Sequence, residues 1–391
     1  MLMKIHDNYF DYGNQQHIGL SPQTEYILNC DGTYFKLMFY LRQKHRKSNK
    51  DSPNNENDKK KEIQDLSLGA LINHIVKNYI ETADASIAHR LNEKYQEFSK
   101  MFPPSQYDRD SRNKIIKELQ NREEKRLLNL KKQYTSSELK KPKKFYLKNE
   151  VKELLIHAMK NGEDKYYKRP GQYLTAIVEE YVHKPYLERE RIFCADLIQE
   201  IDGCIRKKKS LNVTTSTLKH YYMFPLRIET DPMSMYHYVI GYSVPKEALP
   251  DHAAEEEKEK IFLSNKKACA FRLSNISVVE DTPLNNCTLT KTDVSELNKK
   301  VKQQGIQFLL SSPDRIRVKL SEEGVQQYNQ NFHLRPQYTS IEEENIYVFD
   351  CPSDQIKFYF FKFGEKAEIL DPPELRAYFQ NEYQKAFMQY Q

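Results

Sequence analysis

Alternating apolar and polar residues mark a strand-rich region in the second half of the chain. The segment Met223–Val244, MFPLRIETDPMSMYHYVIGYSV, contains two such stretches joined by a polar turn. A charged insert follows, and after it the third stretch spans Ala270–Val278. A period of two residues is typical of a strand with one buried face. The pattern therefore predicts part of a small, strongly curved antiparallel sheet.

A helical periodicity occurs twice in the first half of the chain. The segment Leu68–Glu81, LGALINHIVKNYIE, aligns with Pro170–His183, PGQYLTAIVEEYVH, at an offset of 102 residues, with Gly69 matching Gly171. The matched apolar residues recur three and four positions apart, as on one face of an α-helix. We interpret the repeat as one packing face that is used twice.

The second copy is preceded by a short alternating strand at Lys143–Lys148 and an amphipathic helix at Asn149–Lys160. This order of strand, helix, turn and helix resembles the ribbon-helix-helix module. In that module two strands, normally from two chains, pair into a ribbon whose outward side chains enter a nucleic-acid groove. The resemblance implies that Lys144, Tyr146 and Lys148 face outward. A further hypothesis is that the first copy is a decayed partner that completes the ribbon within one chain.

Shorter patterns predict the other elements. Residues 34–41, YFKLMFYL, suggest a strand, and residues 42–61 are a polar run that we expect to be a flexible insert. A charged helix is expected at 112–134 and a linker helix at 185–207. The C-terminal pattern predicts a small α+β sandwich. Its expected elements are helices at 293–304, 321–331 and 373–390, a strand at 315–320 and a strand pair within 345–363.

The residues of the predicted sheet resemble the WYL domain of bacterial regulators. In that family a Pro-Leu-Arg strand precedes a Trp-Tyr-Leu strand, and a Phe-Arg-Leu-Asp-Arg-Ile strand follows. The counterparts here are Pro225-Leu226-Arg227, His237-Tyr238-Val239 and Phe271-Arg272-Leu273-Ser274-Asn275-Ile276. Only the Tyr of the name-giving triplet is kept, so the resemblance depends on the whole pattern, including Gly241 and the two arginines. It implies a small β-barrel of the Sm or SH3 type.

The segment that starts at Phe361, FKFGEKAEILDPPELRAYF, resembles the extension found after many WYL domains. In relatives this extension often mediates dimer formation, so the resemblance implies a homodimer. Together these patterns predict an α+β multidomain protein. Its expected parts are a helical N-terminal region with the degenerate first copy (1–142), the ribbon-helix-helix-like module with the linker helix (143–207), the WYL domain (208–283) and its extension (284–391).

Composition and charge narrow the class of protein only slightly. Lys and Arg exceed Asp and Glu by 61 to 55, and a net charge of +6 does not by itself prove a nucleic-acid partner. Within residues 101–150, however, 14 Lys or Arg stand against seven Asp or Glu. Such a run suits either a polyanion or a solvated helix face. The six scattered cysteines fit reduced thiols in a cytoplasmic protein, and no apolar window suggests a membrane span.

The motifs of common catalytic sites are absent from the sequence. No glycines stand at the spacing of a Walker loop or of G-x-G-x-x-G, and there is neither an H-E-x-x-H pair nor a G-x-S-x-G elbow. We therefore expect a binding protein rather than an enzyme, without a metal or another cofactor.

The candidate binding residues of the WYL-like sheet are Arg227, His237, Tyr238, Arg272 and Asn275. Arginine offers a planar fork for phosphate, and an aromatic ring offers a stacking surface that accepts any base. The resemblance implies that Arg227, Tyr238 and Arg272 match positions used for ligand or nucleic acid. His237 replaces the family's Trp, and Asn275 replaces its second Arg. The same pattern is also compatible with Tyr238 in the core and with either arginine paired to an acid.

From the residues alone we expect a cytoplasmic, multidomain, dimeric regulator that binds nucleic acid. The combination of the ribbon module, the WYL domain and its extension resembles the WYL-domain accessory proteins of type VI-D CRISPR systems. This resemblance implies binding of single-stranded RNA and stimulation of an RNA-guided ribonuclease effector. Two alternatives stay open. One is a transcriptional regulator that binds duplex DNA and senses a nucleotide or single strand, and the other is a ligand-binding dimer without nucleic acid.

Overall fold

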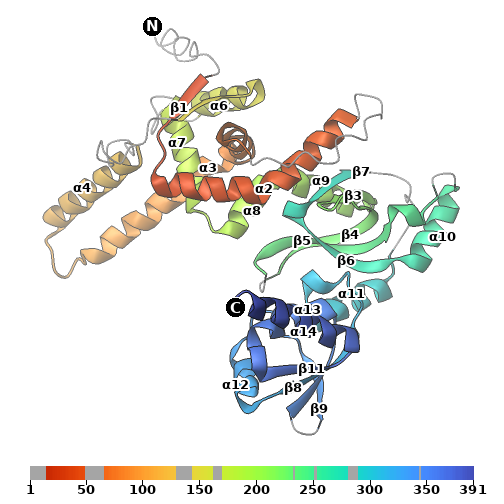
Figure 1. Ribbon diagram of the computed structural model, residues 1–391. Helices are drawn as coiled ribbons and strands as arrows, with labels where there is room; N and C mark the ends of the chain where they lie inside the picture. The colour runs from red at the N-terminus through yellow and green to blue at the C-terminus, as the bar shows by residue number, and fades with distance from the viewer. Residues whose placement is uncertain are drawn as a thin grey trace. The chain divides into compact units, whose positions relative to one another are not determined.

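The computed structural model describes residues 15–48, 66–128, 143–161, 170–231, 234–250, 253–280, 289–342 and 345–391. The chain divides into two compact units, Met1–Asp196 and Leu197–Gln391, each with buried apolar residues of its own (Figure 1). Both units mix helices and strands, so the fold is α+β, as predicted.

The first unit contains two copies of a strand followed by two helices. The first copy comprises β1 (Gln15–Ile18), α2 (Pro22–Ser48) and α3 (Leu68–Met101), and the second comprises β2 (Lys143–Tyr146), α6 (Asn149–Asn161) and α7 (Pro170–His183). Helices α4 (Arg109–Leu128) and α8 (Tyr186–Phe193) also belong to this unit, and α9 (Ala195–Lys207) crosses the division. The predicted repeat is confirmed, because α3 and α7 contact each other and bury their matched apolar residues.

The expected strand at residues 34–41 is wrong, because these residues lie within α2. Leu28 and Phe35 are both fully buried and stand seven residues apart, which places them on one face of a helix. A short apolar run cannot by itself distinguish a strand from a buried helical segment. Helix α2 continues to Ser48, so the first residues of the expected insert are helical, and the rest of that insert lies outside the described residues.

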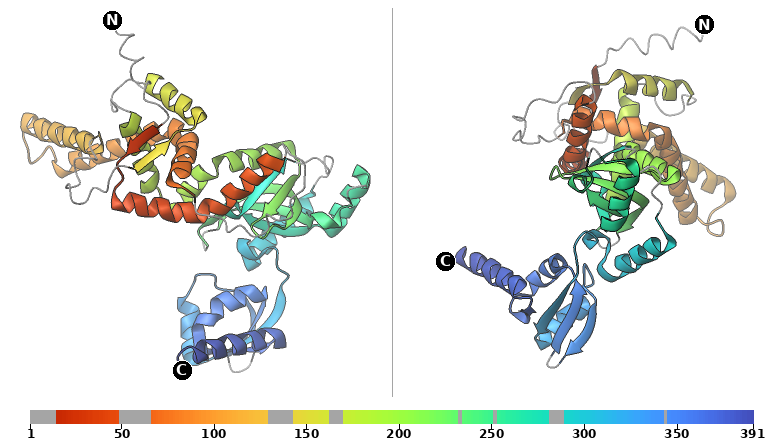
Figure 2. Two further views of the ribbon diagram at one scale, coloured as in Figure 1. Left: turned by 45° about the horizontal axis from the view of Figure 1, so that its top comes forward. Right: turned by 90° about the vertical axis from the view of Figure 1, so that its right-hand side faces the viewer.

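Strands β1 and β2 pair antiparallel and lie side by side, so the ribbon forms within one chain, in agreement with the hypothesis drawn from the repeat (Figure 2). The matched glycines allow this arrangement. A Cβ on Gly171 would lie 2.8 Å from the carbonyl oxygen of His17, and one on Gly69 would lie 3.2 Å from Cβ of Phe145. The second helix of each copy therefore starts against the strand of the other copy; a Cβ at Gly171 would clash there, and one at Gly69 would be in tight contact.

A network around one buried ion pair connects the first copy to the second copy and to α8. Asp31 on α2 is fully buried, and its carboxylate accepts hydrogen bonds from Nε of Arg189 at 2.8 Å and from Nη2 at 3.2 Å. The hydroxyl of Tyr181 on α7 donates a third hydrogen bond to Asp31, at 2.9 Å. Burial and the neighbouring Asp31 carboxylate hold the pKa of Tyr181 well above its usual value. The network thus joins α2 to α7 and α8 through one desolvated carboxylate.

The second unit begins with an antiparallel sheet of five strands. They are β3 (Leu211–Thr215), β4 (His220–Asp231), β5 (Tyr236–Pro245), β6 (Lys267–Arg272) and β7 (Ile276–Glu280), in the order β6-β5-β4-β3-β7. Helix α10 (Glu255–Asn265) lies in the connection from β5 to β6, and the turn η3 (Leu273–Asn275) connects β6 to β7.

The hydrogen-bond ladder of this sheet is open among the described residues, which corrects the expectation of a closed barrel. The predicted strong curvature is nevertheless present. The edge strands of a flat five-stranded sheet lie roughly 19 Å apart, whereas a three-residue turn such as η3 spans at most about 14 Å. Because η3 connects β6 and β7 at opposite edges, the sheet curls so that its edges approach each other.

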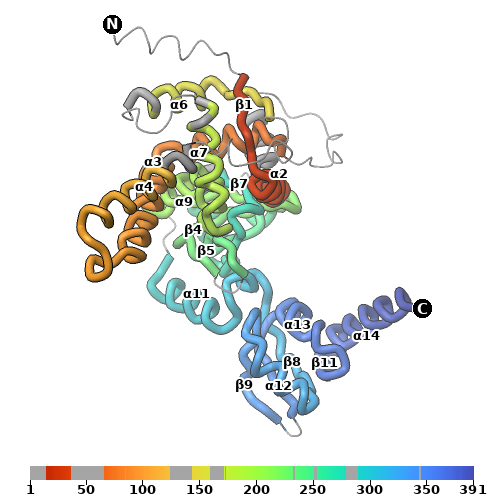
Figure 3. The backbone as a smooth tube through the Cα atoms, turned by 90° about the vertical axis from the view of Figure 1, so that its left-hand side faces the viewer, coloured from red at the N-terminus to blue at the C-terminus, as the bar shows by residue number. Residues whose placement is uncertain are grey.

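The C-terminal part of the second unit has a four-stranded sheet in the order β11-β8-β10-β9. Its strands are β8 (Asp314–Leu320), β9 (Tyr338–Glu342), β10 (Ile346–Cys351) and β11 (Ala367–Asp371). The helical elements are α11 (Lys291–Gln304), η4 (Ile306–Phe308), α12 (Glu322–Gln330), α13 (Ser353–Phe360), η6 (Phe361–Lys366) and α14 (Pro373–Met388), with α14 beside β11 (Figure 3). The predicted α+β character of this region is confirmed.

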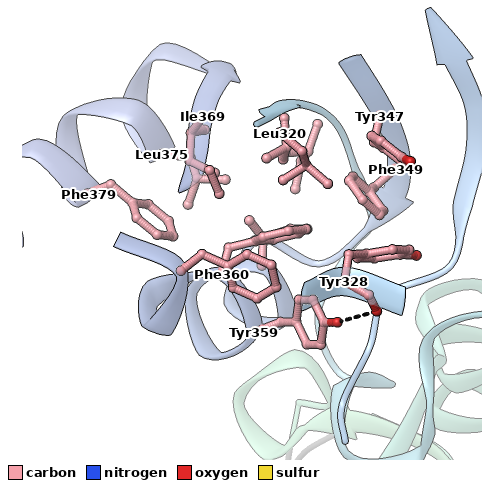
Figure 4. Close-up of a cluster of buried hydrophobic side chains, with 14 of the residues drawn as sticks. Leu320, Tyr328, Tyr347, Phe349, Tyr359, Phe360, Ile369, Leu375 and Phe379 are labelled. Atoms are coloured by element: carbon pink, nitrogen blue, oxygen red, sulfur yellow. Dashed lines mark hydrogen bonds between the residues drawn. The ribbon is translucent and has the colours of Figure 1, made fainter. Parts of the chain in front are cut away.

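Aromatic side chains dominate the core of the C-terminal part (Figure 4). Tyr328 stacks on Phe360, with ring centroids 6.3 Å apart, and its backbone oxygen accepts a hydrogen bond from the Tyr359 hydroxyl at 3.2 Å. Of the strand pair expected within residues 345–363, the first strand is present as β10, whereas the second is wrong, because helix α13 follows β10. Ile356, Tyr359 and Phe360 are buried at positions three and four apart, which is helical spacing.

Candidate nucleic-acid interface

The strand register brings three of the predicted residues to one face of the five-stranded sheet. A bulge between Pro225 and Arg227 shifts the pairing, so that Arg227 lies opposite Ile240 on β5. Two residues earlier on β5, Tyr238 lies opposite Arg272 on β6. Residues directly opposite each other, and residues two apart on one strand, share a face of the sheet. Arg227, Tyr238 and Arg272 therefore share one face of three adjacent strands.

The guanidinium of Arg272 lies over the ring of Tyr236. The guanidinium carbon is 3.2 Å from the ring centroid, and both side chains are half-buried. Such a contact combines cation–π attraction with stacking of two planar groups. Sequence reasoning missed Tyr236, although its position two residues before Tyr238 gives it the same face of β5. The stacked pair offers a planar, cationic surface at the end of β5.

Arg227 forms an ion pair with Glu229, two residues further along β4. Its Nε donates a hydrogen bond to Oε2 of Glu229 at 2.6 Å, and about a third of each side chain is exposed. This arrangement matches the alternative in which an arginine pairs with an acid. The carboxylate holds one edge of the guanidinium and thereby fixes its orientation.

Tyr238 and His237 are core residues. Tyr238 is 7% exposed and packs among the apolar side chains on that face of the sheet, while its hydroxyl lies 3.2 Å from that of Ser234. Burial raises the pKa of the Tyr238 phenol. His237 is 5% exposed and lies opposite Thr230, on the other face. The structure therefore does not present Tyr238 as a stacking platform, and Tyr236, which is half-buried, is the more accessible of the two rings.

Asn275 lies in η3, the turn that follows Arg272, and it is half-buried. It thus lies beyond the end of β6, in the connection between the two edge strands. Ser274, the residue before it, is fully buried.

The β1–β2 ribbon presents a second polar face. Lys144 and Tyr146 are exposed, as predicted, and Tyr146 has 69% of its surface accessible. Their cross-strand partners are His17 and Gln15, which are exposed on the same side. Sequence reasoning missed these two residues because β1 is a four-residue strand, QQHI, with no alternating apolar pattern. The outward face of the ribbon thus carries two basic or titratable groups, an amide and an aromatic ring.

Lys148 follows the strand and is exposed. Its backbone N–H donates to Oδ1 of Asn73 at 2.8 Å, and Nδ2 of Asn73 donates to the carbonyl oxygen of Tyr146, also at 2.8 Å. Asn73 is 4% exposed and stands on the apolar face of α3, at the position that Thr175 occupies in the second copy. An Asn among the apolar positions of the repeat was the one sign in the sequence that could have indicated this positioning role. It fixes the end of β2 and hence the direction of the outward side chains.

The described part of the chain contains no cluster of three or more His, Cys, Asp or Glu side chains suited to hold a metal ion. No described helix is both long and apolar enough to cross a membrane. Each of the cysteines that the structure describes is a free thiol.

Comparison with known proteins identifies the fold but no family. No protein-family model matches the chain, and no curated protein matches it. One solved structure is described as that of a CRISPR Cas-related protein. The alignment with it covers 96% of this chain and 94% of that protein's chain, with a TM-score of 0.61 and 20% sequence identity. Proteasome accessory factor B/C of Arthrobacter aurescens covers 63% of this chain and 37% of its own at 13% identity, and its TM-score of 0.28 is too low to imply a shared fold. The chain therefore shares its fold with the CRISPR Cas-related protein.

Proposed function

We propose that this chain is a nucleic-acid-binding regulatory protein of a CRISPR system, and that it binds single-stranded RNA and stimulates an RNA-guided, RNA-cleaving effector. The observation that carries the proposal is the stack of Arg272 on Tyr236, on the same face of the sheet as Arg227. The similarity in fold to a CRISPR Cas-related protein over 96% of the chain supports the CRISPR assignment. The resemblance of the sheet to WYL domains supports it as well.

The stacked pair has the chemistry that single strands need. A guanidinium plane stacks on a base, and its N–H edge donates to phosphate, so one arginine contacts both parts of a nucleotide. Tyr236 holds Arg272 in a defined plane before binding, which lowers the entropy that binding must overcome. Arg227, oriented by Glu229, adds a second positive group on the same face.

The test is a titration of the protein against single-stranded RNA, single-stranded DNA and duplex DNA at one salt concentration. Arg272→Ala should weaken binding of single-stranded RNA about five-fold or more, because losing one stacked base costs about 1–3 kcal/mol. Arg376→Ala is a matched control, since Arg376 lies on α14 with its side chain about half exposed and pairs with Glu368. Stimulation of the effector should fall in parallel with RNA binding. If binding vanishes while stimulation persists, capture of RNA is not the mechanism.

A second candidate function is a transcriptional regulator that reads duplex DNA. It is favoured by the ribbon, whose outward face carries Lys144 and Tyr146 opposite His17 and Gln15. If Lys144 and Lys148 contact phosphates, changing both to Ala should weaken duplex binding and flatten its dependence on salt, because each lost contact removes about one released counterion. An unchanged salt slope would exclude the two lysines from the interface.

We also propose that the protein is a homodimer that associates through residues 284–391. Phe387, Met388 and Tyr390, at the C-terminal end, are 61%, 60% and 91% exposed. Exposed apolar side chains that lie close together often mark a protein interface. Light scattering of the full chain at micromolar concentration should give the mass of a dimer, and Phe387→Glu should lower it. A monomer for the unchanged chain would refute this assignment.

A further inference from the structure

The ion pair between Arg227 and Glu229 has unused hydrogen-bonding capacity on both sides. Nε of Arg227 and Oε2 of Glu229, 2.6 Å apart, form the one side-chain hydrogen bond that either residue makes within the described part of the chain. The Nη groups of Arg227 and Oε1 of Glu229 have no partner there, and none of these atoms is enclosed. About a third of each side chain is exposed, so a ligand can reach the free atoms from solvent.

Glu229 stands on the face of the sheet that the proposed function assigns to nucleic acid. On β4 it lies opposite Tyr238, and Tyr238 lies opposite Arg272 on β6. Glu229 and Arg272 are therefore two strand spacings apart, which is about 10 Å. A short single strand spans that distance, so a strand held by Arg272 can also contact Glu229.

A cleft of about 430 Å³ beside Glu229 gives a base room to bind. Its lining includes Glu229 and Asp231, at the end of β4, and the end of α11 with η4. A volume of this size accommodates one small molecule or one nucleotide. Because two carboxylates repel a phosphate, the part of a nucleotide that enters beside them is the base.

Hydrogen-bond chemistry distinguishes guanine from the other bases of RNA at such a pair. An ionised carboxylate only accepts hydrogen bonds and can accept two in parallel, whereas a guanidinium only donates. The Watson–Crick edge of guanine carries two adjacent donors, N1–H and the N2 amino group, beside the acceptor O6. Adenine and cytosine carry one amino donor next to an acceptor nitrogen, and uracil carries one N–H between two carbonyl oxygens. Only guanine therefore offers two donors to the carboxylate and an acceptor to the guanidinium.

We infer that Glu229 selects guanine in the bound single strand. N1–H and the N2 amino group of the base donate to the carboxylate, and an Nη group of Arg227 donates to O6. The hydrogen bond from Nε of Arg227 holds the carboxylate in place, and the free atoms of the pair bind the edge of the base. The inference rests on the proposed function and deepens it, because the guanine belongs to the strand that contacts Arg272.

The experiment measures binding of labelled uridine ten-mers that carry separated guanosines, adenosines or cytidines, by fluorescence anisotropy on the full-length protein. Separated guanosines avoid the self-association of guanosine runs. The guanosine-bearing strand should bind about five-fold or more tightly than the plain uridine strand, as expected for one bidentate contact to a base.

Glu229→Gln replaces two acceptors by one acceptor and one donor, a combination that matches the edge of adenine. The preference for guanosine over adenosine strands should therefore disappear. A carboxylate that merely orients Arg227 would instead change all affinities by the same factor, and an unchanged preference would overturn the inference. Glu342→Gln is the matched control. Oε2 of Glu342 also accepts from an arginine Nε, that of Arg317 at 3.0 Å, and its side chain is 36% exposed against 37% for Glu229.

Ligand-observed NMR with GMP, AMP and UMP tests the site apart from strand binding. Binding of GMP that Glu229→Gln removes, without any binding of oligomers, would support the guanine site and overturn the proposed function. Equal affinity of the unchanged protein for guanosine-bearing and plain uridine strands would overturn the guanine site and leave the proposed function standing. Because this last comparison needs no variant, it is decisive even if Glu229→Gln fails to fold.

Discussion

Replacing the arginine of the buried ion pair should lower the free energy of unfolding of the first unit far more than any surface substitution does. In Arg189→Met the side chain keeps an apolar stem of similar reach, but the carboxylate of Asp31 loses both guanidinium hydrogen bonds, of 2.8 and 3.2 Å. Asp31 is fully buried, so water cannot replace them without opening the structure. Of the donors in this network, only the hydroxyl of Tyr181 would still bond to the carboxylate of Asp31.

The expected loss in free energy of unfolding is about 3–5 kcal/mol, the range found when one partner of a buried pair is removed. The hydrogen bond from Nη1 of Arg189 to the carbonyl oxygen of Lys184, at 2.8 Å, adds about 1 kcal/mol to this cost. Most of the loss comes from leaving a charge buried and uncompensated rather than from the attraction of the pair itself. The double variant Asp31→Asn with Arg189→Met should therefore recover part of the stability, since it buries no charge at this site.

Urea unfolding followed by circular dichroism at 222 nm measures the effect, because the helices give a strong signal and the chain has no tryptophan. Arg376→Met is the matched control, because it breaks an ion pair with Glu368 in which both side chains are about half exposed. If Arg189→Met shifts the unfolding midpoint no further than this control, the buried pair does not stabilise the first unit. A double variant as unstable as Arg189→Met would show that lost packing, not the stranded charge, causes the effect.

Three further perturbations test the fold and the site. Gly241→Ala should destabilise the five-stranded sheet and lower the melting temperature strongly, since the added Cβ would overlap the carbonyl oxygen of Phe224. Gly203→Ala is the control; no atom lies within 4 Å of its added Cβ, so the melting temperature should change little or rise. Burial raises the pKa of Tyr328 to about 12. Because the unfolded phenol ionises first, stability should fall as the pH rises from 10 to 12, and Tyr328→Phe should flatten that fall in urea titrations. Asn73→Ala should increase hydrogen exchange at the end of β2 and weaken any binding by the ribbon, and unchanged exchange there would contradict its positioning role.

The patterns that the sequence revealed correctly are those set by local periodicity. The alternation in Met223–Val244 corresponds to β4 and β5, and the helix at Pro170–His183 was predicted to the residue. The failures also have a local cause. Residues 34–41 are a short apolar run that suits a strand as well as a helix, and only burial on a helical face distinguishes the two. Residues 353–360, SDQIKFYF, mix polar and apolar residues, and there too the buried positions follow helical spacing.

The candidate site was predicted only in part. The resemblance to WYL domains singled out Arg227, Tyr238 and Arg272, and the register places all three on one face of β4, β5 and β6. The alternation could not indicate how deeply each side chain on that face would be buried. Tyr238 lies in the core because other apolar residues of the second unit pack on it, while Tyr236, at the end of the strand, is half-buried with Arg272 over its ring.

The sequence by itself determined the α+β class, the two-fold use of one helical face and the position of the curved sheet, because each depends on residues within a few positions of one another. Only the tertiary structure decided the pairing of β1 with β2 and the packing of Arg272 against Tyr236 rather than Tyr238. These features join residues that are far apart along the chain. Such contacts are fixed by how whole elements pack and by the register of their strands, and a local pattern of apolar and polar residues carries no record of either.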